Sequence, residues 1–320
     1  MDKTATLRMF GAMKTLIKNR KDYQSWKNGY YHLSSDGWQE GKLFNNEQQF
    51  AFGMTLMGLI TLRFEIVIYD FTLMDNHVHI LMSGKGADCV GVFDYLKKKL
   101  SARLIRDGFP PLPEDYGFKL TPVKDEEQMR INFLYLDRNP FERGLCIPVG
   151  YPWGSAYLHY SELSECLEGV PASSLSGRKL DLLTGSRTPG PGHWTFKPQW
   201  GLHPESCVDN SRFERLFSGP KDYQTRLVKE YEAFVKLGAS IDDVPVFSQL
   251  EMNDIAEMLA RELFPGKRLR TLSQEEKGRL CLPLEERYLF TATQIAETLS
   301  LPEYLVKQLL SSKDYGKRRR

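Results

Sequence analysis

Apolar residues follow two different spacings along the first half of the chain, and each spacing predicts one kind of element. They recur every three or four positions in residues 45–64 and 87–106, which is typical of helices with one buried face. Residues 64–73 and the run HVHILM at 77–82 are rich in β-branched and aromatic residues, which favours strands. Further helices are predicted at 5–26 and 125–140, and further strands at 30–33 and 118–123.

The order of these elements between residues 29 and 160 predicts the fold class. The order is strand, helix, strand, strand, helix, strand, helix. Only Met74, Asp75 and Asn76 separate the second strand from the third, so these two strands are expected to be antiparallel neighbours. We therefore predict an α+β fold, namely a ferredoxin-like antiparallel sheet with helices on one face.

A change in composition predicts the division of the chain into domains. Residues 161–205 are rich in Gly, Pro and Ser and are predicted to form a connection. Residues 1–28 precede the α+β domain of residues 29–160 as an N-terminal helical extension. Residues 206–320 are expected to be an all-α C-terminal region, with a helix-turn-helix at about 272–312. Such a helix-turn-helix can bind DNA or another protein.

Charge is informative through its distribution rather than its total. The 43 basic and 41 acidic residues leave a net charge of only +2. Clusters of basic residues suit contact with phosphate groups, although a solvated helix face explains each cluster equally well. The clusters are Lys97, Lys98, Lys99, Arg103 and Arg106; Lys267, Arg268 and Arg270; and Lys317, Arg318, Arg319 and Arg320.

Cysteine usage and hydropathy point to a cytoplasmic protein. The five cysteines are scattered, odd in number and lack the CxxC spacing of zinc or redox motifs, which is typical of a reducing compartment. No segment approaches the run of about 20 apolar residues that spans a membrane, so no membrane partner is expected.

Two histidines on one predicted strand are candidate metal ligands. Side chains alternate across a strand, so His77 and His79 should point to the same side, where two neutral imidazoles can reach one divalent ion. An HxH pair on a strand is weak support when taken alone. The remaining histidines, His32, His159, His193 and His203, occur singly and are expected to have structural roles.

The predicted helix at 125–140 carries a candidate nucleophile. Asp125 and Gln128 resemble a capping box, and Pro140 is expected to end the helix. Tyr135 and Asn139 share one helix face, apart from the apolar stripe. An amide oxygen at Asn139 would be a hard ligand beside the two imidazoles. Most tyrosines only pack and donate a hydrogen bond, so this placement alone is modest support.

The strings LMDNHVHILMSG (73–84) and YLDRNPFERGLCIPVGYPWGSAYLHY (135–160) together resemble the single-tyrosine transposases of the insertion-sequence-200-like family, especially the REP-associated tyrosine transposases. That family shows MPNHVHLL, then YIxxNPVRAGLV and YPWSS. Asp75 replaces the family's usual Pro, residues 141–143 replace VRA, and Gly154 replaces the first Ser of WSS. None of these departures removes a chemical group that the reaction needs.

The resemblance implies an HUH endonuclease fold for residues 29–160 and a specific chemistry. Tyr135 would attack a DNA phosphate and form a 5′-phosphotyrosine link, and His77, His79 and Asn139 would hold the metal. Family precedent favours Mg²⁺ or Mn²⁺, whereas ligand softness would also suit Co²⁺ or Zn²⁺. No organic cofactor is expected, and the protein would act as a monomer or a homodimer.

The substrate that the resemblance implies is single-stranded or hairpin DNA, such as palindromic repeat DNA. Lys97, Lys98, Lys99, Arg103 and Arg106, with Lys307 in the helix-turn-helix, are candidate DNA contacts. Two alternatives stay open. The first is a domesticated, non-catalytic DNA-binding regulator that uses the helix-turn-helix, and the second is a metal-dependent hydrolase without a covalent intermediate.

Overall fold

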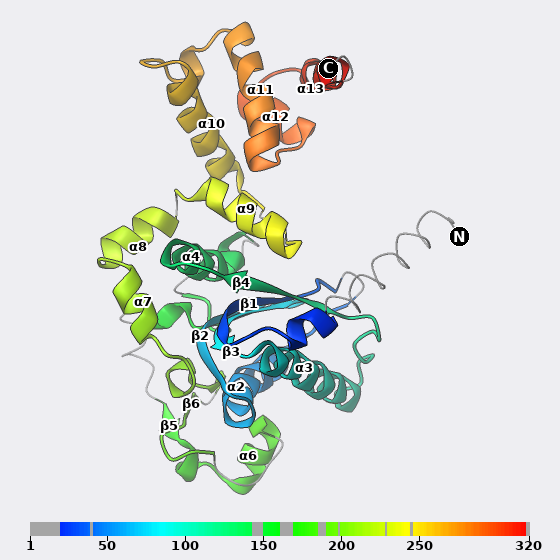
Figure 1. The fold of residues 1–320 in the computed structure, drawn as a ribbon, viewed down its shortest axis with the longest axis vertical. Helices are drawn as coiled ribbons and strands as arrows, with labels where there is room; N and C mark the ends of the chain where they lie inside the picture. The colour runs from blue at the N-terminus through cyan, green and yellow to red at the C-terminus, as the bar shows by residue number, and fades with distance from the viewer. Residues whose placement is uncertain are drawn as a thin grey trace. The chain divides into compact units, whose positions relative to one another are not determined.

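The computed structural model divides the chain into two compact units, residues 1–227 and 228–320 (Figure 1). The structure describes residues 20–38, 41–142, 150–160, 169–184, 190–197, 199–227, 229–243 and 246–317. Most of the helix predicted at 5–26 lies outside these residues, and its described part, 20–24, is helical. No helix among the described residues combines the length and the apolar character needed to cross a membrane.

A four-stranded antiparallel sheet organises the first unit. Its strands are β1 (Gly29–Ser35), β2 (Ile66–Leu73), β3 (Val78–Gly84) and β4 (Phe118–Val123), in the order β2-β3-β1-β4. Every neighbouring pair is antiparallel. The predicted mixture of helices with an antiparallel sheet is therefore confirmed.

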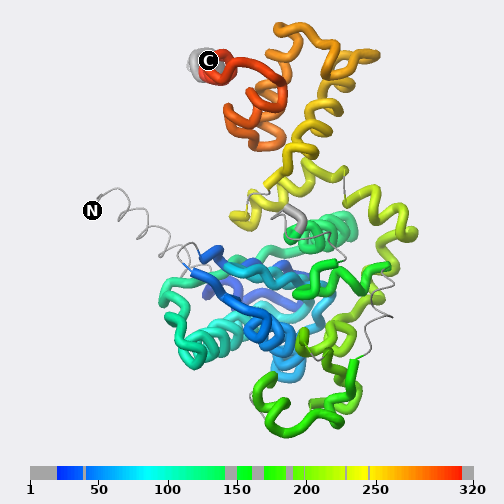
Figure 2. The backbone as a smooth tube through the Cα atoms, turned by 180° about the vertical axis from the view of Figure 1, so that it is seen from behind, coloured from blue at the N-terminus to red at the C-terminus, as the bar shows by residue number. Residues whose placement is uncertain are grey.

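Helices cover both faces of this sheet (Figures 1 and 2). Helices α2 (Glu47–Arg63) and α3 (Gly86–Arg106) pack on the face that carries Leu33 and Ile80, and together they form the main hydrophobic core. Helix α4 (Glu126–Glu142) lies across the opposite face. The prediction of helices on one face is therefore wrong, because the polar face of the sheet meets a helix with matching polar groups instead of water.

A bulge in β2 decides which of its side chains meet α4. The register between β2 and β3 shifts between Ile68 and Asp70. Ile68 belongs to the core under α2 and α3, and beyond the shift it is Phe71 that belongs there. Because one extra residue reverses the alternation, Asp70 faces the same side as Thr72, whose hydroxyl bonds to α4.

Helix α4 begins as predicted but ends later than predicted. Asp125 Oδ1 accepts a hydrogen bond from Gln128 N at 2.7 Å, which caps the first turn. The helix continues through Pro140 to Glu142. Proline has no N–H to donate to the carbonyl four residues earlier, but that carbonyl, Leu136 O, accepts the Thr72 hydroxyl at 2.9 Å. The bond from β2 therefore satisfies the group that the proline leaves without its usual donor.

The rest of the first unit extends the core. A small sheet and one helix add Leu180, Trp194 and Phe196 to the cluster that α2 packs against, whereas α7 and α8 pack against α4. The elements are η2 (Ala156–Leu158), β5 (Val170–Pro171), η3 (Ala172–Ser174), α6 (Gly177–Thr184), β6 (Thr195–Lys197), β7 (Gly201–Leu202), η4 (Pro204–Ser206), α7 (Ser211–Leu216) and α8 (Pro220–Leu227).

The second unit is helical and has a core of its own, which includes Ile255, Leu280 and Ile295. Capping boxes begin α10, α11 and α12, so the sequence itself sets where these helices start. The elements are α9 (Tyr231–Ile241), α10 (Gln249–Leu263), η5 (Leu269–Thr271), α11 (Gln274–Tyr288), α12 (Ala292–Leu299) and α13 (Glu303–Lys317).

Substitutions on opposite faces of α10 test how this core is built. Ile255 is 0% exposed and Leu250 is 71% exposed. We expect Ile255→Ala to lower the free energy of unfolding by about 2–5 kcal/mol, because it removes buried methyl groups and leaves a cavity. Leu250→Ala should change it by less than about 0.5 kcal/mol. Urea unfolding followed by far-ultraviolet circular dichroism measures both, and equal effects would contradict the described orientation of α10.

Candidate active site

The two imidazoles predicted to share a metal lie side by side. His79 is in β3, and His77 lies one residue before the first residue of that strand. Their ring centroids are 4.8 Å apart, and both side chains are buried. His77 Nδ1 is 2.7 Å from Asn76 Oδ1, so Nδ1–H donates to the amide oxygen and the lone pair of the ring is on Nε2.

Tyr135 from α4 faces the same group of rings. Its ring centroid is 5.8 Å from that of His79 and 6.2 Å from that of His32. Residues three or four apart lie on one face of a helix, so Asn132 and Asn139 accompany Tyr135 toward the sheet. The polar face of α4 and the polar face of the sheet therefore meet at one place.

Hydrogen bonds link the two amides of α4 through two histidines. Asn132 Nδ2 donates to Gln128 O at 2.7 Å, which turns Asn132 Oδ1 toward His32. His32 Nδ1–H donates to that oxygen at 2.7 Å. With both rings neutral, His32 Nε2 accepts from His79 Nδ1–H at 3.0 Å.

This chain of bonds fixes the tautomer of His79. Because Nδ1 carries the proton, Nε2 carries the lone pair, and Nε2 lies 3.3 Å from Asn139 Nδ2. A histidine that ligates a metal through one nitrogen commonly donates a hydrogen bond from the other, which orients its ring. His32 supplies that acceptor for His79, and Asn76 supplies it for His77.

The donor set suits a divalent metal. The site offers the Nε2 atoms of His77 and His79 in the tautomer that ligation requires. The Asn139 amide presents Nδ2 to His79 Nε2 in this structure, so it has to turn over to offer its oxygen to an ion. Imidazole binds first-row divalent ions, and an amide oxygen is a hard ligand of the kind that Mg²⁺ and Mn²⁺ prefer. These residues therefore fit the group that the sequence led us to expect.

The site is closed to solvent in this structure. Tyr135 is 1% exposed, and His77, His79 and Asn139 are also buried.

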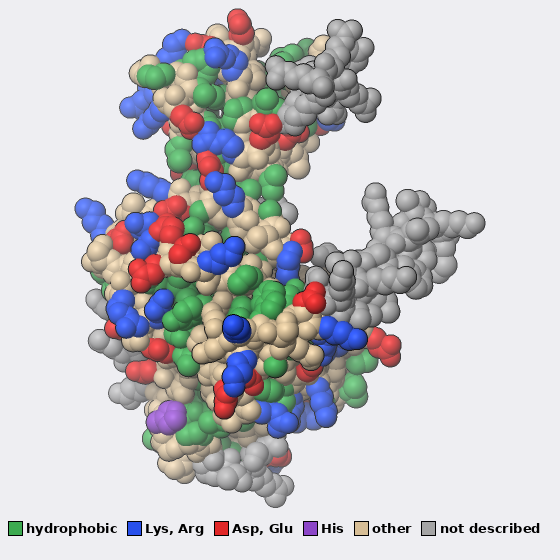
Figure 3. Space-filling model, viewed as in Figure 1, with side chains coloured by type: hydrophobic (Ala, Val, Ile, Leu, Met, Phe, Trp, Pro, Cys, Tyr) green, Lys and Arg blue, Asp and Glu red, His purple; other side chains and the backbone are tan. Residues whose placement is uncertain are grey.

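The predicted basic cluster of α3 lies elsewhere. Helix α3 packs on the sheet face opposite the one that α4 covers (Figure 1). Lys97 Nζ donates to Glu114 O at 2.7 Å, and the buried Arg103 pairs with Asp107 at 2.6 Å. Lys98 and Arg106 are exposed. Figure 3 shows basic and acidic side chains interspersed over this view rather than gathered in one basic patch.

Sequence reasoning missed His32. It was expected to have only a structural role because it occurs singly in the sequence. Strand β1 lies next to β3, and the pairing of His32 with Leu81 puts its ring beside His79. The signal available in the sequence was that His32 interrupts the run of Tyr30, Tyr31 and Leu33, but the pairing of β1 with β3 was needed to use it.

No family model matches this chain, and no curated protein matches it significantly. Among solved structures, a REP-associated tyrosine transposase bound to a REP hairpin is similar to it, with 14% sequence identity and a TM-score of 0.34. The similarity covers 41% of this chain and 79% of that chain. At this TM-score the similarity carries no conclusion by itself, so the proposed function depends on the residues of the site.

Replacing His32 tests whether it orients His79. The His77–His79 site is identified as the Mn²⁺ site that a His77→Ala/His79→Ala variant lacks. We expect His32→Ala to weaken Mn²⁺ binding at this site by about 10–100-fold, because the His79 tautomer is no longer fixed. Calorimetric titration measures the affinity. His203→Ala, which removes another buried histidine of the same unit, should leave it unchanged. Tight binding by the His32 variant would mean that His32 does not support the site.

Proposed function

We propose that this chain is a metal-dependent single-stranded DNA endonuclease and strand transferase with an HUH endonuclease fold. In this proposal Tyr135 forms a 5′-phosphotyrosine intermediate on hairpin or palindromic repeat DNA. The observation that carries the proposal is the approach of the Tyr135 ring to His79 and His32 across the sheet. The strand-helix-strand-strand-helix-strand order and the strand order β2-β3-β1-β4 support the fold.

The proposed reaction exchanges one ester bond for another. The Tyr135 oxygen bonds to phosphorus while the bond from phosphorus to the 3′-oxygen breaks. The phenol loses its proton and the 3′-oxygen gains one, which leaves a free 3′-hydroxyl. Because the number of phosphoester bonds does not change, the reverse reaction can join strands without ATP.

The chain's own residues position the reacting groups. Helix α4 carries both Tyr135 and Asn139, so one rigid element sets the distance between the nucleophile and the amide. His32 and Asn76 hold the two imidazoles in place. A divalent metal, Mg²⁺ or Mn²⁺, held by His77, His79 and Asn139 would supply positive charge at the phosphate.

We propose that the second unit contacts DNA through its helix-turn-helix. Helices α12 and α13 are joined at Ser300, which has a left-handed backbone (φ 52°) and ends α12. In this proposal the pair would form the helix-turn-helix predicted at about 272–312, and Lys307 is exposed on α13, where it pairs with Glu303. An exposed second helix after a tight turn is the arrangement that reads a DNA groove in helix-turn-helix proteins.

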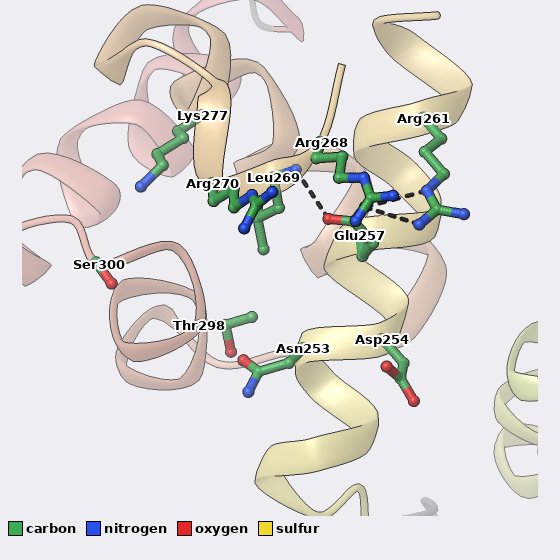
Figure 4. Close-up of a pocket in the computed structure, with 10 residues that line it drawn as sticks. All are labelled: Asn253, Asp254, Glu257, Arg261, Arg268, Leu269, Arg270, Lys277, Thr298 and Ser300. Carbon is green, nitrogen blue, oxygen red and sulfur yellow. Dashed lines mark hydrogen bonds and ion pairs between the residues drawn. The ribbon is translucent and has the colours of Figure 1, made fainter. Parts of the chain in front are cut away.

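A hollow of about 650 Å³ lies beside this turn (Figure 4). Its lining includes Ser300 and four basic side chains, of which Lys277 donates to Leu299 O and Arg261 pairs with Glu257. Arg268 and Arg270 are exposed at its rim. We propose that these two arginines contact DNA phosphates next to the helix-turn-helix.

An adduct assay tests the catalytic proposal. The full chain is incubated with Mn²⁺ and end-labelled single-stranded hairpin DNA, and the protein–DNA adduct is measured on a denaturing gel. We expect Tyr135→Phe to form no adduct, because it lacks the attacking oxygen. Tyr95→Phe, on α3, should form as much adduct as the unchanged chain.

Three other results would each replace the proposal. Equal adduct from Tyr135→Phe would mean that another group attacks the phosphate. Cleavage without adduct that persists in Tyr135→Phe would indicate direct hydrolysis. Hairpin binding that is insensitive to His77→Ala, with no cleavage in any metal, would indicate a regulator that binds DNA without cutting it.

Removing the two exposed arginines tests the DNA contact of the second unit. We expect Arg268→Ala/Arg270→Ala to weaken DNA binding and to reduce the slope of log affinity against log salt by about 2, since two phosphate contacts are lost. Fluorescence anisotropy at several salt concentrations measures the slope. Lys229→Ala/Lys236→Ala, an equal loss of charge outside the hollow, is the control. An equal change in the two variants would refute a specific contact.

A further inference from the structure

Three buried ionisable side chains from separate segments meet between the sheet and α4. Asp70 comes from β2, Asp137 from α4, and His159 directly follows η2. All three are 0% exposed, and their potential ligand atoms lie within 4.8 Å of one another. His159 Nε2 is 3.8 Å from Asp70 Oδ1 and 3.8 Å from Asp137 Oδ2, the carboxyl oxygens that also accept hydrogen bonds.

Each of the three side chains is held by a neighbour. Ser155 Oγ donates to Asp70 Oδ1 at 2.6 Å, and the Tyr223 hydroxyl donates to Asp137 Oδ2 at 2.8 Å. His159 Nδ1–H donates to Asn210 Oδ1 at 2.9 Å. The imidazole therefore presents the lone pair of Nε2 to the two carboxyl groups.

Each side chain also keeps one atom without a hydrogen bond. Among the described residues, Asp70 Oδ2, Asp137 Oδ1 and His159 Nε2 have no hydrogen-bond partner. A buried polar atom that lacks a partner costs free energy. The carboxyl groups of Asp70 and Asp137 also interact as a hydrogen-bonded pair, which requires a shared proton. A metal ion could replace that proton and satisfy His159 Nε2 as well.

The charge state of the three groups sets the condition under which an ion would bind. Burial raises the pKa of Asp70 to about 8, and burial together with Asp70 raises the pKa of Asp137 well above its usual range. Burial lowers the pKa of His159, so its imidazole is neutral. Burial therefore penalises the charged carboxylates, and a divalent cation would neutralise their charge of −2 only by displacing their protons.

We propose that Asp70, Asp137 and His159 form a buried structural site for a zinc-type divalent ion, separate from the His77 and His79 site. Zn²⁺ binds histidine nitrogen and carboxylate oxygen at about 2.0–2.2 Å, so one ion fits between donors 3.8 Å apart after a small adjustment. The ring of Phe213 stacks on His159 with centroids 3.7 Å apart and gives the site an apolar wall.

The site would join β2 to the helix that carries Tyr135. Asp137 is two residues beyond Tyr135 in α4, and Asp70 precedes Thr72, which already bonds to that helix. An ion shared by the two carboxylates would therefore fix α4 against the sheet. The proposed metal site does not depend on the proposed DNA cleavage, because its ligands are different residues.

Metal stoichiometry tests the proposal. The full chain is freed of metal with a chelator, titrated with Zn²⁺, and assayed by mass spectrometry of bound metal. We expect His77→Ala/His79→Ala, which leaves the buried cluster intact, to keep one tightly bound equivalent. His159→Gln should lose that equivalent, and Asp70→Asn should lose it too. Co²⁺ bound in place of Zn²⁺ should show visible absorption in the histidine double variant and none when His159→Gln is added.

Stability gives a second measurement that needs no activity. A 100-fold excess of free Zn²⁺ over the dissociation constant should raise the melting temperature of the His77→Ala/His79→Ala variant by about 5–10 °C. Adding His159→Gln should abolish this rise. If the double variant binds no metal and its melting temperature does not respond to Zn²⁺, the cluster is a proton-sharing network and the proposal is wrong, whether or not the chain cuts DNA.

Discussion

The structure depends on how the polar face of one sheet is satisfied. His32 and His79 are fully buried, and burying imidazole rings without partners would cost more free energy than a small domain can readily offset. Helix α4 resolves this by placing Asn132 and Asn139 at the two ends of the His32–His79 pair. The same contact brings Tyr135 to the rings. The packing of α4 on the sheet therefore both provides partners for the buried imidazoles and places Tyr135 beside them.

Two irregularities make this surface possible. The bulge in β2 turns Asp70 toward α4, where regular alternation would have turned it toward the apolar core. Pro140 leaves the carbonyl of Leu136 without its usual helical donor, and Thr72 from β2 supplies the missing bond. Both features produce contacts between α4 and β2. The same contact between β2 and α4 includes the buried group of Asp70, Asp137 and His159. These two elements are therefore linked by several polar contacts as well as by apolar packing.

Local patterns in the sequence predicted the strands and helices around residues 29–142 and indicated His77, His79, Tyr135 and Asn139, because period and spacing are properties of short segments. The position of α4 on the second face of the sheet could not be predicted in this way. It depends on pairing between β1 and β3, which brings His32 to His79 across 47 residues. Asp70 was missed because a bulge cannot be read from alternation, and His159 because its partners lie in three other segments.

The central claim is that the Tyr135 phenol and the two imidazoles surround one metal ion. It is tested most directly by fluorine nuclear magnetic resonance on the chain labelled with 3-fluorotyrosine, with the Tyr135 signal assigned by its loss in Tyr135→Phe. In the His159→Gln chain, which lacks the second proposed metal site next to Tyr135, we expect Mn²⁺ to broaden this signal beyond detection, and in His77→Ala/His79→Ala/His159→Gln we expect the signal to stay much sharper. A Tyr135 signal that stays sharp while Mn²⁺ is bound to His77 and His79 would contradict it.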